Sequence, residues 1–124
     1  MFTSDRIIGI DKLRSSIPAE LQSWSVFCNI IELHYYGDIN EFGQDVKCLK
    51  LVLSDAESRF RIELDLNNVH GEVRFDTCNG FCSGFQIDDL SDSGCEKANT
   101  FHLHSYEMDI EPDFYCESIK VSML

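Results

Sequence analysis

Basic residues are scarce in this sequence of 124 amino acids. Ten Lys and Arg side chains stand against 22 Asp and Glu, which gives a formal net charge of −12 at pH 7. Recognition of nucleic acid depends on clustered Lys and Arg that neutralise phosphates, so this charge argues against direct nucleic-acid binding. An acidic surplus of this size indicates a basic partner instead.

Long apolar runs, internal repeats and low-complexity segments are also absent. No stretch approaches the roughly 20 apolar residues that span a bilayer, and residues 1–24 lack the basic start and unbroken apolar segment of a secretion signal. We therefore expect a cytoplasmic protein that makes no membrane contact. A chain of this length is expected to form a single domain over residues 1–124.

Recognisable catalytic motifs are missing too. Residues 78–85, CNGFCSGF, contain two glycines but no helix signal follows them, so they do not form a phosphate-binding loop. No nucleophile stands in a recognisable turn or at a helix start. The sequence thus predicts neither an enzyme nor a cofactor.

The chain does contain six cysteines, for which three interpretations remain open. Without a secretion signal they are expected to be reduced thiols that serve as small core residues, and paired disulfides are the alternative. Cys78 and Cys82 have a spacing compatible with a zinc ribbon, although no second matching pair follows. The six are Cys28, Cys48, Cys78, Cys82, Cys95 and Cys116.

Alternation of apolar and polar residues dominates the chain from about residue 25 onward. The clearest pattern, in residues 59–66, predicts a strand that pairs with residues 47–54 in an antiparallel hairpin. Residues 72–77 are expected to add a third strand in a meander. Residues 28–36 predict a further strand with one fully apolar face, made by Ile31, Leu33 and Tyr35.

A short helix is expected at about residues 16–23, where Ser15 or Ser16 can cap it and Pro18 fits its first turn. The closing segments 101–110 and 114–123 each change the parity of their apolar residues, which indicates a bulge or a crossing between packed layers. The predicted fold is mainly β: an antiparallel β-sandwich or strongly curved sheet of about seven strands with one short N-terminal helix.

The strand FHLHS places two histidines on one face. His102 and His104 lie about 7 Å apart along such a strand, close enough for both imidazoles to bind one metal ion. Phe101 and Leu103 then occupy the inward face. The favoured interpretation is that both histidines are polar surface residues without a metal; the alternative is a metal-binding β-barrel enzyme that uses His102, His104 and Glu107.

Acidic side chains concentrate in the last third of the chain, together with aromatic residues. From Asp76 onward ten acidic residues stand against Lys97 and Lys120 alone. Such rows of carboxylates repel one another unless a basic partner neutralises them. A solvated surface and a calcium site are the alternatives, although no EF-hand spacing is present. The predicted partner-binding residues are Asp88, Asp89, Asp92, Tyr106, Glu107, Asp109, Glu111, Asp113 and Tyr115.

Three segments together carry a family resemblance: LDLNNVHGEVRF, GFQIDDLSDSGCE and FHLHSYEMDIEPDFYCESIKV. Their order of strands resembles small β-rich immunity proteins encoded beside bacterial polymorphic toxins, including those of contact-dependent growth inhibition systems. The resemblance implies a cytoplasmic protein that binds a cognate toxin domain, often an RNase-type nuclease, and blocks its active site. An acidic surface suits such a basic partner. A generic protein-interaction domain remains an alternative.

Overall fold

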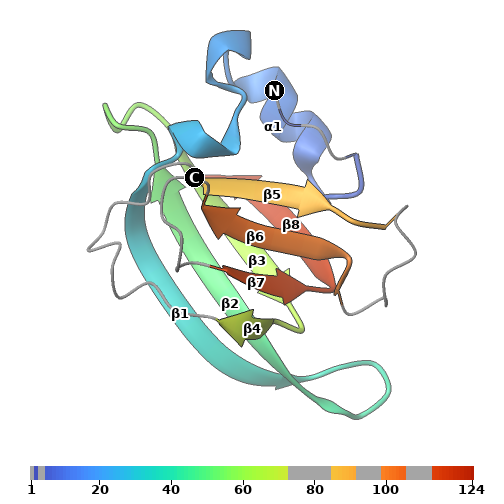
Figure 1. The fold of residues 1–124 in the computed structure, drawn as a ribbon. Helices are drawn as coiled ribbons and strands as arrows, with labels where there is room; N and C mark the ends of the chain where they lie inside the picture. Colours follow the sequence, from blue (N-terminus) through green and yellow to red (C-terminus); the bar gives the residue numbers. More distant parts are fainter. Residues whose placement is uncertain (1, 3–4, 73–84, 92–98, 106–112) are drawn as a thin grey trace.

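A computed structural model describes residues 2, 5–72, 85–91, 99–105 and 113–124. These residues form two antiparallel four-stranded sheets stacked in a sandwich, with the helical N-terminal segment at one end (Figure 1). The first sheet has the order β1-β2-β3-β8 and the second the order β4-β7-β6-β5. The prediction of a mainly β, sandwich-like fold with one short helix is confirmed.

The elements follow one another along the chain as a helix, two short 3-10 turns and eight strands in the described residues. The helical elements are α1 (Ile10–Ser16), η1 (Ala19–Leu21) and η2 (Trp24–Val26). The strands are β1 (Asn29–Ile39), β2 (Asp45–Ser54), β3 (Arg61–Asn67), β4 (His70–Glu72), β5 (Phe85–Asp89), β6 (Phe101–Ser105), β7 (Asp113–Cys116) and β8 (Ser118–Met123).

The core lies between the two sheets, and alternation along each strand supplies it. Leu51 of β2 lies opposite Leu64 of β3, which in turn lies opposite Val121 of β8, and all three are almost completely buried. The second sheet contributes residues such as Leu103 and Phe114, both fully buried. The predicted hairpin of residues 47–54 and 59–66 is therefore confirmed as β2 and β3.

The chain crosses between the sheets at two adjacent points. Asn68, with a φ of 55°, turns the chain out of β3 and into β4 of the second sheet. Glu117 carries it back from β7 to β8, and its backbone N–H donates to the Asn67 carbonyl at 3.0 Å. This second crossing is the change of layer that the parity of residues 114–123 predicted.

The expected meander is wrong at its third strand. After β3 the chain does not fold back onto β3; instead β4 pairs with β7 in the other sheet, and β8 takes the place beside β3. The positive φ angles of Asn68 and Gly71 direct the chain away from the first sheet. Residues 73–77, the rest of the predicted strand, lie outside the described residues.

The helix begins and ends earlier than the predicted residues 16–23. It spans Ile10–Ser16, and Ile17 after it has extended backbone angles of −114° and 134°. Extended geometry is what the following Pro18 imposes on its predecessor, so the proline stops the helix instead of starting it. Pro18 then precedes the 3-10 turn η1. Within α1, Ile10 and Leu13 face the core.

Candidate functional site

Two surfaces of the described chain combine features that ligands or partners use. The first is a cluster of imidazoles and carboxylates on the outer face of the second sheet, hereafter the histidine cluster: Asp88, His102, His104 and Asp113. The second is the apolar and acidic surface of the β1–β2 hairpin.

Strand register builds the histidine cluster. Phe101 and Leu103 of β6 are buried, so His102 and His104 point to the outer face, as the sequence predicted. Asp88 of β5 lies directly opposite His102, and Asp113 of β7 lies opposite His104. Two neighbouring strands therefore place one carboxylate on each side of the histidine pair.

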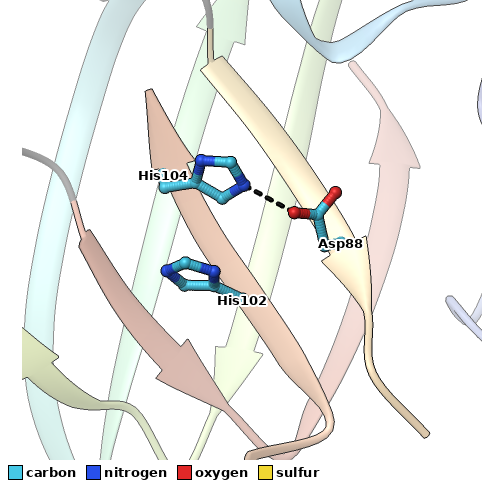
Figure 2. A group of neighbouring side chains, drawn as sticks. All are labelled: Asp88, His102 and His104. Atoms are coloured by element: carbon cyan, nitrogen blue, oxygen red, sulfur yellow. Dashed lines mark hydrogen bonds and ion pairs between the residues drawn. The ribbon is translucent and has the colours of Figure 1, made fainter. Parts of the chain in front are cut away.

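The hydrogen bonds in the histidine cluster run diagonally across this register. His104 Nε2 lies 2.6 Å from Asp88 Oδ2 (Figure 2), and His102 Nε2 lies 2.6 Å from Asp113 Oδ1. A carboxylate only accepts, so each imidazole donates its Nε2 proton in this arrangement. The rings of His102 and His104 stack with their centroids 4.4 Å apart.

A tyrosine extends this row of rings. Tyr115 of β7 stacks on His102 with a centroid distance of 4.5 Å and an interplanar angle of 12°. On its other side lies the His70 ring, at 6.0 Å. His70 itself is hydrogen-bonded to Asn99. The row fixes the orientation of His102, because a ring that is stacked on both faces has little freedom to rotate.

The acidic residues predicted to bind a partner have defined contacts where the structure describes them. Asp88 and Asp113 hold the two histidines, and their side chains remain about half exposed. Asp89 forms an ion pair with Arg6 at 3.7 Å and accepts hydrogen bonds from Ser91. The other predicted members lie outside the described residues: Asp92, Tyr106, Glu107, Asp109 and Glu111.

The β1–β2 hairpin carries large apolar side chains in solvent. The face of β1 that the sequence predicted as fully apolar is exposed: Ile31 is 45%, Leu33 43% and Tyr35 50% accessible. A β-bulge at Ile31 interrupts the register with β2. Toward the tip of the hairpin, Ile39 and Phe42 are still more exposed, at 65% and 73%.

A hollow of about 800 Å³ separates the hairpin tip from the crossing points at Asn68 and Glu117. Its lining residues are acidic, apolar and amide-bearing, and the amides are Asn40, Gln44, Asn67 and Asn68. The acidic and apolar lining residues are Ile39, Glu41, Phe42, Asp45, Val46 and Glu117.

The outer face of the first sheet carries a lysine that pairs with two carboxylates. Lys50 lies 3.7 Å from a Glu32 carboxylate oxygen and 3.4 Å from one of Glu63. These two carboxylates, Glu32 first, raise the pKa of Lys50 above its usual range. Burial and the neighbouring Glu63 carboxylate raise the pKa of Asp65. Lys50 therefore offsets only part of the negative charge on this face, where carboxylates outnumber the lysines near them.

The cysteines that the structure describes are buried free thiols. Cys28, Cys48 and Cys116 have no disulfide partner, and burial raises the pKa of the Cys116 thiol far above its ordinary value. They match the expectation of small core residues. Cys78 and Cys82, the candidates for a zinc ribbon, lie outside the described residues together with Cys95.

Sequence reasoning missed the association of Asp88 with the histidine pair. The alternation of Phe85 and Ile87 with polar neighbours already places Asp88 on the outer face of its strand. The missing information was the register between β5 and β6, which are separated by an 11-residue connection. Alternation predicts a face, but it does not predict which residues lie opposite each other.

Comparison of the chain with family models, curated proteins and solved structures found no match. Among the helices of the described residues, none has the length and apolar character required to cross a bilayer.

Proposed function

We propose that the protein is an immunity protein, which binds and neutralises a basic toxin domain of the nuclease type. The observation that carries the proposal is the β1–β2 hairpin, where exposed apolar side chains border an acidic hollow. This combination suits a protein partner better than a small substrate, since apolar anchors with a charged rim are typical of protein–protein interfaces.

Apolar exposure on the hairpin exceeds what scattered surface residues require. Leu33 and Tyr35 follow one another on a single face of β1. Ile39 and Phe42 expose further apolar surface toward the tip, beyond Gly37 and the Lys47 amine beside it. Several large apolar side chains exposed on one hairpin are typical of interaction sites. β1 is also an edge strand of its sheet among the described strands, so its outer backbone groups face away from β2 (Figure 1).

Charge supports a basic partner. The hollow at the hairpin tip includes the carboxylates of Glu41, Asp45 and Glu117, and the whole chain has a formal net charge of −12. A Lys or Arg side chain entering the hollow meets carboxylates together with the apolar surface of Phe42. Nuclease sites are basic because they hold phosphates, and an acidic inhibitor is steered toward them at rates up to about 10⁸ M⁻¹s⁻¹ at low salt.

The test is a pull-down from native cells with the tagged full-length protein, at low and at high salt, followed by co-expression. We expect one basic polypeptide to co-purify in a 1:1 ratio, to arrest growth when it is expressed alone, and to be neutralised by this protein. Recovery without a stoichiometric partner, or a partner that is harmless alone, would overturn the proposal.

A double variant and a matched control locate the interface. Ile39→Ser with Phe42→Ser removes two exposed anchors, and we expect it to weaken binding of the captured polypeptide by at least about tenfold. Leu124→Ser removes an apolar side chain of similar exposure, 64%, at the far C-terminus. We expect that control to bind like the unmodified protein; equal loss in both would argue against the hairpin as the interface.

A further inference from the structure

We propose that Asp88, His102 and His104 form a binding site for a divalent transition-metal ion of the zinc type. The site is distinct from the hairpin surface, lies on the outer face of the second sheet, and does not depend on the identity of a protein partner. Its three residues come from two adjacent strands, β5 and β6 (Figure 2).

Distances favour the proposal. One ligand atom from each of the three side chains can be chosen so that all of them lie within 4.8 Å of one another. The centre of a triangle with that edge is about 2.8 Å from each corner, so the ligand atoms need to move inward by less than about 1 Å to reach a zinc–ligand distance of about 2.0–2.2 Å. Small side-chain rotations supply such a movement.

The backbone of the site is already fixed. His102 and His104 lie two residues apart on β6, which is hydrogen-bonded to β5 on one side and β7 on the other. Tyr115 stacks against His102 and limits its rotation. Since the strands hold the three Cβ positions in place, metal binding requires little ordering of the chain, and a preorganised site loses less free energy on binding.

The donor set selects the class of metal. Imidazole nitrogens suit zinc and its transition-metal neighbours, whereas calcium and magnesium prefer oxygen ligands. Two imidazoles with one carboxylate resemble the three-ligand sets of open zinc sites. The side chains are only partly buried, with 13% exposure for His104, 23% for His102 and 43% for Asp88. The remaining coordination position is therefore open to water or to a donor from another molecule.

The two carboxylates have different places around such an ion. Asp88 contributes the oxygen ligand, since its carboxylate is the one that groups with both histidines. Asp113 lies 2.6 Å from His102 Nε2 on the opposite side of the pair and adds negative charge beside the ion. Metal binding replaces the hydrogen bond between His104 and Asp88. Each ligating nitrogen gives up its proton, because a nitrogen that carries a proton cannot bind the metal.

Titration of the reduced, chelator-treated full-length protein with Zn²⁺ tests the proposal. We expect one ion per chain, with affinity at least about tenfold lower in His102→Gln, His104→Gln and Asp88→Asn. Millimolar Ca²⁺ or Mg²⁺ should not compete. His34→Gln is the matched control, because His34 is another strand histidine beside an aromatic ring, with its centroid 5.1 Å from that of Tyr36 and the two planes tilted by 53°. Its affinity for zinc should stay within about twofold.

Two spectroscopic measurements distinguish metal bound by the histidines from metal bound by cysteines. One of them uses the unmodified protein, so misfolding of a variant does not affect it. Co²⁺ bound in place of zinc should show no thiolate-to-cobalt charge-transfer band. In the unmodified protein, the imidazole nitrogen signals of His102 and His104 should shift on zinc addition while those of His34 do not. Absence of binding, binding that survives all three substitutions, or a thiolate band would each overturn the proposal.

Discussion

β1 and β2 are neighbours in one sheet, paired over most of their length, yet their inward residues have opposite environments. Leu33 of β1 lies directly opposite Leu51 of β2; Leu51 is fully buried, whereas Leu33 is 43% exposed. The two leucines share a residue type, a sheet and a face. What differs is the layer above them, because the second sheet covers β2 but leaves Leu33 uncovered. Burial in this fold is therefore decided by the opposite sheet, and the uncovered strand is available to a partner.

The largest effect is expected when the two opposed leucines are each replaced by alanine. Leu51→Ala should lower the free energy of unfolding by about 2–5 kcal/mol, because it removes buried methyl groups and leaves a cavity. Leu33→Ala should change it by no more than about 0.5 kcal/mol, because solvent already reaches that side chain. Chemical denaturation of both variants under the same conditions measures the difference.

The same pair of variants separates stability from binding. Leu33→Ala is expected to weaken capture of the basic partner while it leaves the unfolding midpoint nearly unchanged. A loss of several kcal/mol in Leu33→Ala would contradict the structure, since it would show that this face of β1 is covered in the folded protein.

Much of this arrangement could be predicted from alternation along the chain. The burial of Ile62 and Leu64, the outward histidines of β6 and the apolar face of β1 all follow from a period of two. Exposure of that apolar face could not be predicted, because a sequence pattern identifies which residues share a face but not whether another layer packs on it. The place of β4 was missed for a related reason: the turn at Asn68 redirects the chain to the other sheet.

In the histidine cluster too, the sequence pattern identified side chains that share a face but not the residue of a neighbouring strand that joins them. The spacing of His102 and His104 identified two of the proposed ligands, and the sequence offered Glu107 as the third because it is near in the chain. The structure brings Asp88 to the pair instead, across a strand register. Glu107 lies outside the described residues. Local spacing finds ligands within one strand, whereas a ligand from a neighbouring strand requires the pairing to be known.

A second prediction compares a glycine in the packed end of the fold with one at the exposed hairpin tip. Gly9 and Gly43 both have positive φ angles, 88° and 74°, so alanine at either position is strained by about 1 kcal/mol. A Cβ on Gly9 would also lie 2.3 Å from the Val121 carbonyl oxygen, whereas nothing lies within 4 Å of one on Gly43. We expect thermal unfolding to report a loss of about 2–4 kcal/mol for Gly9→Ala and only about 1 kcal/mol for Gly43→Ala. Similar losses would indicate that α1 does not pack against β8 as described.

The smallest effect concerns the turns at the two ends of β2. At the exposed end, the Asn40 side-chain oxygen accepts the backbone N–H groups of Phe42 and Gln44. At the covered end, the buried Asp55 carboxylate accepts the Phe60 N–H at 2.8 Å and pairs with Arg59. Burial alone would raise the pKa of Asp55, but these hydrogen bonds outweigh it and hold the pKa below its ordinary value.

The lowered pKa gives the turn at Asp55 a pH dependence that the turn at Asn40 lacks. A carboxyl group with a depressed pKa in the folded state stabilises the protein above its unfolded-state pKa of about 3.9, and loses this contribution as pH falls through the folded value. Asp55→Asn keeps the shape but removes the charge, so we expect it to lower the free energy of unfolding by about 1 kcal/mol near pH 7. Urea unfolding at a series of pH values should show that the difference from the unmodified protein is constant above about pH 5 and shrinks below it. Asn40→Ala should instead show a difference that does not vary with pH; a pH-independent difference for Asp55→Asn would mean that its charge does not stabilise the turn.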